Sequence, residues 1–190
     1  ALDVTTQKQI LSLIDGLRVI GQFMNSFIIA ENRNALLIID QHVAHERILF
    51  EWIRSKRGQG IIERQALVAP EPLHVDRKAV AFVNDRLAEL NELGFEIEPF
   101  GESTFLVRTV PAALKRRDPL KALQEIIDDM LEAENSGGRT ASMPAREALW
   151  ITCACKMSVK AGDPLTHAEM EKLIFDLAET ENPYLCPHGR

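Results

Sequence analysis

The sequence has no long hydrophobic run, and this absence excludes a helix that crosses a membrane. Its longest uninterrupted apolar segments, among them Ala35–Ile39 and Ala79–Val83, are far shorter than the roughly 20 residues that such a helix needs. The N-terminus also lacks the pattern of a secretory signal peptide. The short apolar runs lead us to expect no membrane partner. Because the chain begins with Ala1 rather than Met and stops abruptly at Arg190, we also expect a fragment of a longer protein.

Cysteine and positive charge are both scarce. Three cysteines, an odd count, without a secretory signal predict reduced thiols in a cytoplasmic compartment, where thiolates are available as metal ligands. The formal net charge of -6 predicts weak binding to DNA by this chain alone, because Lys and Arg supply most non-specific affinity for phosphates. Basic clusters at Arg54–Arg57 and Lys115–Arg117 are candidates for local phosphate contacts, although most such clusters are simply solvated.

Glycine-rich phosphate-binding loops are absent as well. Neither GxGxxG nor GxxxxGKS/T occurs, so we expect no nucleotide in this domain. What the sequence does contain is the composition of a folded globular protein, with 46% hydrophobic and 26% charged residues. A chain of 190 residues forms one domain, or one domain with two lobes.

The first part of the chain is predicted to be a three-stranded meander that runs into a helix. Its strands are three apolar segments separated by turn residues, Val19–Phe23, Phe27–Ala30 and Ala35–Ile39. After Asp40 the apolar residues recur at helical spacing as far as Ser55–Gly58. A strand therefore changes into a helix at Asp40.

The middle of the chain alternates between strand and helix patterns, and the block from about Leu73 to Leu131 is predicted to be a lobe of its own. The expected elements are an extended segment over Ile61–Val68 that ends at Pro70 and Pro72, a helix from Asp76 to Gly94, a hairpin-like pair over Phe95–Ile97 and Thr104–Val110, and a helix that starts at Asp118–Pro119.

Glu134–Gly138 is the clearest linker signal in the sequence. Beyond it we expect a helix from Pro144 to about Lys160 that is apolar nearly all round and is therefore packed on several sides. Thr166 and Glu169 form the pattern of a capping box for a final helix, whose apolar positions are Met170, Leu173, Ile174 and Leu177.

Two clusters have the residue types of a metal site. His42 and Glu46 are four residues apart, so both can face one ion from the same side of a helix, although this spacing is also common on solvated helices. Cys186 and His188 offer the sulfur and nitrogen donors that suit zinc, with a buried cysteine and a surface histidine as the equal alternative.

Cys153 and Cys155 resemble a metal pair but diverge by about 200° around a helix, so at most one is a ligand, and we favour Cys155. A metalloprotease is disfavoured because neither HExxH nor HxxEH occurs.

Three motifs in chain order resemble those of the MutL endonucleases of DNA mismatch repair. The segment Asp40–Glu51 resembles DQHA followed by two residues, Glu, four residues and Glu, with Val43 in place of the motif's Ala. Ala154–Lys156 is similar to the family motif ACR or ACK, and Cys186–Arg190 is similar to CPHGR. The resemblance extends beyond these motifs, because Val19–Phe23 and the apolar run into Asp40 look like strands of the family, and it covers essentially the whole chain.

The resemblance implies an α/β (α+β) fold with two lobes. A dimerisation and endonuclease lobe, with a small sheet packed by helices, would comprise residues 1–70 and 139–190, and a smaller α/β regulatory lobe would be inserted at 71–138. It also implies a metal-dependent enzyme that hydrolyses a phosphodiester bond and nicks one strand of duplex DNA.

The resemblance further implies one or two ions per protomer, Zn²⁺ and/or Mn²⁺. Zinc suits the sulfur and nitrogen donors, whereas the family implies manganese for nicking. The catalytic candidates are Asp40, His42 and Glu46; the candidate ligands are His42, Glu46, Cys155, Cys186 and His188; the motif positions without an assigned role are Gln41, Glu51, Lys156 and Arg190.

Gln65, Leu67 and Pro70 resemble the sliding-clamp-binding sequence of bacterial MutL endonucleases, and a Pro-ended edge strand is the alternative reading. The other implied partners are a second copy in a homodimer, duplex DNA, a MutS-type mismatch recogniser and the N-terminal ATPase region of the family. The implied location is the bacterial cytoplasm, near the nucleoid.

The alternative function is a non-enzymatic dimerisation scaffold in which the Cys and His residues hold a structural zinc. The intact set of Asp40, His42 and Glu46 favours the enzyme.

Overall fold

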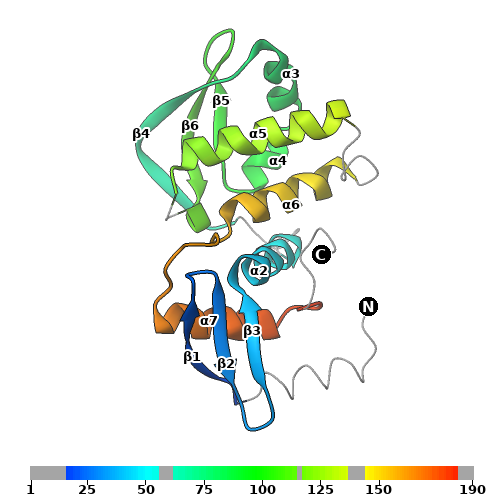
Figure 1. The fold of residues 1–190 in the computed structure, drawn as a ribbon. Helices are drawn as coiled ribbons and strands as arrows, with labels where there is room; N and C mark the ends of the chain where they lie inside the picture. Colours follow the sequence, from blue (N-terminus) through cyan, green and yellow to red (C-terminus); the bar gives the residue numbers. More distant parts are fainter. Residues whose placement is uncertain (1–15, 56–61, 115–116, 137–143, 184–190) are drawn as a thin grey trace. The chain divides into compact units, whose positions relative to one another are not determined.

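The computed structural model describes residues 16–55, 62–114, 117–136 and 144–183, which form two compact units (Figure 1). The first unit combines both ends of the chain, Ala1–Trp52 and Ser158–Arg190, and the second is Ile53–Met157. Each unit has its own three-stranded antiparallel sheet, so the mixed helix and sheet class predicted from the sequence is confirmed. Among the described helices, none combines the length and the apolar character required to pass through a bilayer.

The first unit is built on a meander of β1 (Arg18–Phe23), β2 (Phe27–Glu31) and β3 (Leu36–Asp40), paired in that order. Three residues, Met24 to Ser26, connect β1 to β2. Met24 and Asn25 both have positive φ, 52° and 48°, and the N–H of Ser26 donates to the carbonyl oxygen of Phe23 at 3.1 Å, which closes a tight turn. The predicted meander is therefore confirmed.

One face of this sheet packs against α7 (His167–Ala178), as Figure 1 shows. Thr166 and Glu169 form the predicted capping box at the start of α7, with both reciprocal hydrogen bonds present. The buried residues that make this core are Val19, Ile28 and Ala30 from the sheet, Ala44, and Met170, Leu173, Ile174 and Leu177 from α7. Burying a side chain of this size contributes about 1.5–3 kcal/mol to folding.

The opposite face of the same sheet is apolar and exposed. Ile20, Leu36 and Ile38 are 49%, 63% and 66% exposed. Isolated surface hydrophobics need no explanation, but a group of them on one sheet face is characteristic of an interaction surface.

A helix follows the meander without any loop. Asp40 is the last residue of β3, and Gln41 is the first residue of α2 (Gln41–Ser55), as the sequence predicts. The geometry of the sheet thereby sets where the first turn of α2 begins.

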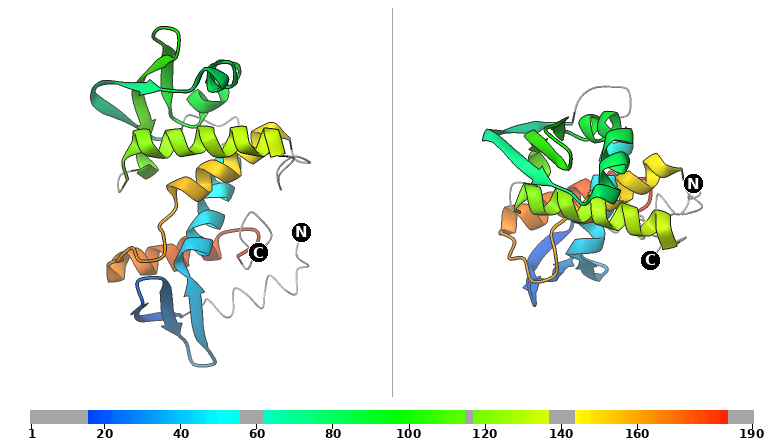
Figure 2. Two further views of the ribbon diagram at one scale, coloured as in Figure 1. Left: turned by 45° about the horizontal axis from the view of Figure 1, so that its top comes forward. Right: turned by 90° about the horizontal axis from the view of Figure 1, so that it is seen from above.

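The second unit contains a sheet with the order β4-β6-β5, formed by β4 (Arg64–His74), β5 (Glu96–Pro99) and β6 (Thr104–Pro111). A short 3₁₀ turn, η1 (Ala112–Leu114), follows β6. Figure 2 shows α5 (Pro119–Ser136) alongside α6 (Ala145–Met157) in this unit. Its core includes the fully buried side chains of Leu90, Phe95, Phe105, Leu123, Ile126, Ile127 and Leu149.

The predicted chain break at Pro70 and Pro72 is wrong, because β4 continues to His74. β4 lies at the edge of its sheet, where a residue without an N–H is tolerated. The pairing with β6 jumps between Ala66 and Glu71, so Pro70 lies in an irregular bulge and not in the ladder. The hairpin-like pair predicted after Gly94 is confirmed as β5 and β6.

The single helix predicted between Asp76 and Gly94 is two helices, α3 (Arg77–Asp85) and α4 (Leu87–Glu92). The break lies at Arg86, whose φ of -114° and ψ of 9° are not helical. Asp76 occupies the N-cap position, but its side chain makes no capping hydrogen bond. Gly94 has a φ of 97°, and a Cβ there would lie 3.3 Å from the Cα of Pro111.

Two helix ends also differ from the prediction. α5 continues through Glu134 to Ser136, so the predicted linker begins inside a helix. α6 ends at Met157, three residues before the predicted end at Lys160. The residues that follow α6 take part in the candidate site.

Candidate metal centre

His42 and Glu46 face each other on the first turns of α2. Nε2 of His42 lies 3.2 Å from Oε1 of Glu46, and the two side chains are 29% and 4% exposed. Both atoms are of types that ligate metals. A carboxylate so far removed from water is costly unless a positive charge accompanies it. The geometry therefore provides two ligand atoms that converge on a site for a cation.

The other ring nitrogen of His42 is held by the segment that follows α6. Nδ1 lies 2.9 Å from the carbonyl oxygen of Val159 and 3.0 Å from Oγ of Ser158. Because a carbonyl oxygen can only accept a hydrogen bond, Nδ1 carries a hydrogen, which leaves Nε2 as the ring nitrogen that can offer a lone pair to a cation beside Glu46. This is the arrangement by which a backbone carbonyl orients a metal-ligating histidine.

His45 binds the same residue from the next turn. Its Nδ1 accepts a hydrogen bond of 2.9 Å from the backbone N–H of Val159. The backbone N–H of Lys160 donates to the carboxylate of Asp163 at 2.7 Å. These side chains replace the helical partners of the backbone after Met157, which accounts for the early end of α6. The sequence reading missed His45, since no local pattern reveals a partner so distant in the chain.

Asp40 caps α2. Its Oδ1 accepts hydrogen bonds from the backbone N–H groups of His42 at 2.9 Å and Val43 at 3.1 Å, the contacts of an N-cap. Its Oδ2 accepts no hydrogen bond from the described residues. The predicted catalytic role of Asp40 stays a prediction. The structure adds a second role, that of the N-cap of α2.

Gln41 is completely buried and joins three parts of the first unit. Its amide nitrogen donates to the carbonyl oxygens of Asn25 at 2.8 Å, Lys160 at 2.7 Å and Asp163 at 3.1 Å. Its Oε1 accepts a hydrogen bond of 2.5 Å from the side chain of Gln22. The motif glutamine thus fixes the start of α2 relative to the β1–β2 turn and to the segment after α6.

Glu51 holds the segment that follows α7. Its Oε2 accepts a hydrogen bond from the backbone N–H of Glu181 at 2.6 Å, and its Oε1 accepts one from the N–H of Asn182 at 3.2 Å. Nη1 of Arg47 lies 3.5 Å from Oε1. The last motif residue of α2 therefore has a backbone partner, which the sequence reading did not assign.

Lys156 forms ion pairs within the second unit. Its Nζ lies 2.8 Å from Asp129 and 3.6 Å from Glu125, both on α5. Burial lowers the pKa of Lys156, but the hydrogen bond to Asp129 and the negative charges of Asp129 and Glu125 outweigh it, so the pKa is raised. The lysine of the second motif thus links α6 to α5.

Cys153 and Cys155 differ in their surroundings. Cys153 is fully buried, and burial raises the pKa of its thiol, which disfavours the thiolate that a metal requires. Cys155 is partly exposed. This difference favours Cys155 as the candidate ligand, in agreement with the choice made from the sequence. Cys186, His188 and Arg190 of the third motif lie outside the described residues.

The residues of the predicted clamp-binding sequence lie on β4. Gln65 and Pro70 are exposed and Leu67 is half-buried, in and beside the irregular pairing between Ala66 and Glu71. Val68 projects fully into solvent. The strand therefore displays this sequence on a sheet edge.

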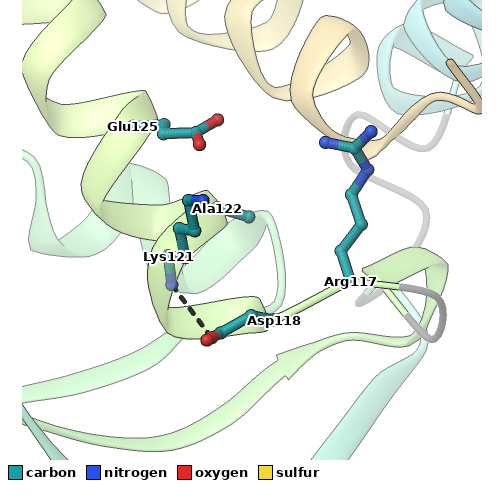
Figure 3. A pocket seen from close by; sticks show the side chains of 5 residues that line it. All are labelled: Arg117, Asp118, Lys121, Ala122 and Glu125. Carbon is teal, nitrogen blue, oxygen red and sulfur yellow. Dashed lines mark hydrogen bonds between the residues drawn. The ribbon is translucent and has the colours of Figure 1, made fainter.

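A pocket of about 280 Å³ lies at the N-terminus of α5 (Figure 3). Oδ1 of Asp118 accepts hydrogen bonds from the backbone N–H groups of Leu120 and Lys121, so this helix terminus is already capped. Arg117 of the predicted basic cluster lines the pocket, while Lys115 and Arg116 lie outside the described residues. Of the candidate ligands that the structure describes, His42, Glu46 and Cys155, none lines this pocket.

Comparisons with known proteins give matches over most of the chain. The family described as MutL C terminal dimerisation domain matches residues 20–165. The DNA mismatch repair proteins MutL of Koribacter versatilis and Solibacter usitatus are 41% identical over 92% and 95% of this chain. That of Geobacter sulfurreducens is 33% identical over 100% of it. The matches cover 26%, 27% and 31% of these relatives, so the chain spans about a quarter to a third of their length.

Proposed function

The chain belongs to the family of MutL C-terminal dimerisation domains, and on this premise we propose that it is a metal-dependent endonuclease that nicks one strand of duplex DNA in mismatch repair. The observation that carries the proposal is the pair of His42 and Glu46. Nε2 of His42 and Oε1 of Glu46, two atoms of metal-ligating types, lie 3.2 Å apart, and Nδ1 on the other side of the ring contacts the carbonyl oxygen of Val159. A cation completes such an arrangement.

The donor chemistry fits zinc and manganese. Imidazole and carboxylate serve both ions, and a thiolate adds preference for zinc. We propose Cys155 as the third ligand. Ser158, whose hydroxyl contacts His42, follows Cys155 by three residues, so the covalent chain keeps the two Cα atoms within about 11 Å of each other.

Cys186 and His188 are proposed as further ligands. Asn182, whose N–H binds Glu51, precedes Cys186 by four residues, a reach of up to about 14 Å. Glu51 itself follows Glu46 by five residues of the same helix, a rise of about 7.5 Å. The segment is therefore long enough for Cys186 to reach Glu46.

A metal bound there would lower the pKa of a coordinated water and offset the negative charge that develops on the leaving oxygen. His42 and Glu46 hold the ligand atoms, and the carbonyl group of Val159 fixes the ring of His42. Asp40 caps the same helix through its Oδ1. We propose that its Oδ2 binds the catalytic ion or orients a ligand. Gln41 keeps these parts in register.

We further propose that the domain is a homodimer in which the exposed face of β1–β3 packs on a second copy. Ile20, Leu36 and Ile38 supply the apolar surface that a stable subunit interface requires. In this arrangement β3 contributes to the dimer interface, and α2, which follows it directly, contributes His42 and Glu46 to the candidate metal centre.

Other partners are proposed to bring DNA to the site, because the net charge of -6 gives the chain little affinity of its own. Gln65, Leu67 and Pro70 are the proposed contact with a sliding clamp, through the exposed edge of β4. The ATPase region and a MutS-type recogniser are the remaining proposed partners, in the bacterial cytoplasm.

The test is nicking of supercoiled plasmid DNA with Mn²⁺, with the clamp and the ATPase region of the family present. Glu46→Gln removes one ligand oxygen and is expected to reduce nicking by roughly 100-fold or more. Glu171→Gln on the exposed side of α7 makes the same change of charge and should nick as the unaltered protein does. Unimpaired nicking by Glu46→Gln would overturn the proposed site.

Metal analysis of the same proteins separates the enzyme from the scaffold. Zinc that is retained by the unaltered protein, with no nicking at any Mn²⁺ concentration, would favour the non-enzymatic dimerisation scaffold with a structural zinc.

A further inference from the structure

The peptide group between Val159 and Lys160 is held at both of its ends. Its carbonyl oxygen, that of Val159, lies 2.9 Å from Nδ1 of His42. Its N–H, that of Lys160, donates to Oδ2 of Asp163 at 2.7 Å. The C=O and N–H of a trans peptide share one plane and point in opposite directions. The carboxylate of Asp163 therefore fixes the plane in which the carbonyl group meets the ring of His42.

A tight turn brings the side chain of Asp163 to this peptide. The N–H of Asp163 donates to the carbonyl oxygen of Lys160 at 3.2 Å, which closes a turn of four residues. The third residue of the turn is Gly162, whose φ of 93° suits glycine. Because the turn reverses the chain, the carboxylate of its fourth residue reaches the N–H of its first. The contact therefore follows from the local turn geometry.

Other hydrogen bonds hold the path of this segment but act on neighbouring peptide groups. His45 accepts the N–H of Val159, which belongs to the preceding peptide. Gln41 donates to the carbonyl oxygens of Lys160 and Asp163, which belong to later peptides. Each of these groups is separated from the 159–160 plane by rotatable backbone dihedrals. Removing the carboxylate of Asp163 therefore leaves the path held and releases the N–H end of one peptide.

The carboxylate also strengthens the hydrogen bond to His42. An amide whose N–H is bound by a charged acceptor is polarised, so its carbonyl oxygen accepts more strongly. A stronger acceptor beside Nδ1 favours the ring form with its hydrogen on Nδ1 and its lone pair on Nε2, the atom that lies beside Glu46. The hydroxyl of Ser158, 3.0 Å from the same Nδ1, both donates and accepts and so does not select this form.

We propose that Asp163 is a positioning residue for His42: through the 159–160 peptide it orients the ring and keeps Nε2 available to a cation. This inference rests on the proposed function, because it takes His42 as a metal ligand. Loss of a partner behind a ligating histidine weakens metal binding by about 10- to 100-fold. Because Asp163 acts through a peptide group, we expect the lower end of this range.

Zn²⁺ binding measures the effect on the metal centre. Asp163→Ala should raise the dissociation constant for Zn²⁺, measured in competition with a chromogenic chelator, about tenfold. Asp163→Asn keeps an acceptor oxygen and loses only the charge, so its dissociation constant should stay within about threefold of that of the unaltered protein. Asp176→Ala, an equal loss of charge from an ion pair with Lys172 on α7, should bind Zn²⁺ as the unaltered protein does.

The ring nitrogens of His42 provide a readout that a merely structural role would not move. In the metal-free protein, at a pH where the ring is neutral, ¹⁵N chemical shifts distinguish a hydrogen on Nδ1 from one on Nε2. Asp163→Ala should move the hydrogen toward Nε2, where the carboxylate of Glu46 accepts it. Asp163→Asn and Asp176→Ala should keep the distribution of the unaltered protein.

The outcomes separate the inference from the function on which it rests. Unchanged Zn²⁺ affinity in Asp163→Ala would overturn the positioning role and leave the metal centre standing. A tenfold loss of affinity with an unchanged ring would also overturn it, because Asp163 would then act by a route other than His42. An unaltered protein that binds no Zn²⁺ would overturn the proposed metal centre itself, and the inference with it.

A second variant guards against general loss of structure. If Asp163→Ala lowers the melting temperature strongly, Asp163→Ser takes its place, because its hydroxyl keeps the position polar but ends one bond short of the N–H of Lys160. The same shift of the ring hydrogen and the same tenfold loss of affinity are expected in Asp163→Ser. Affinity and ring nitrogens like those of the unaltered protein would again overturn the inference.

Discussion

Nδ1 of His42 lies 2.9 Å from the carbonyl oxygen of Val159, a residue 117 positions later in the chain. The contact is made by the backbone of Val159, so its side chain is not required for it. The orientation of the His42 ring therefore depends on the path of the segment after α6. His45, Gln41 and Asp163 also hold that path, through hydrogen bonds to the backbone of Val159 and Lys160.

The two roles of Asp40 can be separated by substitution. Asparagine caps helices as well as aspartate does, so Asp40→Asn should melt within a degree or two of the unaltered protein. Without the charge, nicking should fall by roughly 100-fold. Asp40→Ala should lose activity and, in addition, about 1 kcal/mol of stability. Full nicking activity in Asp40→Asn would show that this carboxylate acts only as a helix cap.

Replacing Gln41 with leucine should destabilise the protein. The substitution leaves the carbonyl groups of Asn25, Lys160 and Asp163 without this donor, and we expect a loss of about 2–4 kcal/mol in urea denaturation. Gln124→Leu, which breaks an exposed bond to Asp128, should change stability by less than about 0.5 kcal/mol. Equal effects of the two substitutions would contradict the joining role of Gln41.

The ion pairs of Lys156 predict a dependence of stability on pH. Because the pKa of Lys156 is raised in the fold, its contribution is complete below the ordinary lysine value of 10.5 and is lost as the pH rises through the folded value. Lys156→Met should therefore be less stable by about 1 kcal/mol at pH 7, and the difference should shrink in alkaline solution. A difference that stayed constant from pH 7 to strongly alkaline solution would mean that the charge of Lys156 contributes nothing.

A charge on the exposed sheet face should disrupt the proposed homodimer. Ile38→Lys places an ammonium group in the middle of the apolar surface, and the dissociation constant measured by analytical ultracentrifugation should rise tenfold or more, a shift of roughly 1.4 kcal/mol or more. Phe175 on α7 is also an exposed apolar residue and serves as the control. The melting temperature of Phe175→Lys should depend on protein concentration no more than that of the unaltered dimer does. A monomeric unaltered protein would refute the dimer directly.

The proposed clamp contact depends on Leu67 and not on its neighbour. Leu67→Ala should weaken binding to a sliding clamp roughly tenfold in a surface-binding assay. Val68→Ala removes a comparable aliphatic side chain from the same bulge, but Val68 is not part of the matching sequence, and binding should persist. The two variants should melt alike, since neither side chain belongs to the core.

Local rules predicted much of the fold. Apolar periodicity identified β1–β3, α2 and α7, and the sequence of Thr166 and Glu169 gave the start of α7 to the residue. The errors arose where tertiary contacts decide. Pro70 reads as a chain break until β4 is known to be an edge strand, and α6 reads as longer until His45 and Asp163 are known to take its backbone partners.

The candidate site was predictable in its composition and less so in its connections. His42 and Glu46 follow from helical spacing, because their contact spans one turn. The partners of Gln41 and Glu51 lie 119 and 130 positions away in sequence, at Lys160 and Glu181, where no local pattern reaches. The motif shows that these residues matter together, whereas only the three-dimensional structure shows what each one holds.

The direct passage from β3 into α2 limits how this protein can change in evolution. Each residue of a helix advances the side-chain direction by about 100°, so one residue inserted or deleted at Asp40 would rotate Glu46 away from any ion. Elsewhere a loop absorbs such a length change, but this junction has none. Insertions in related chains should therefore collect in the turns of the meander and avoid the boundary between Asp40 and Gln41, a pattern that aligned sequences would reveal at once.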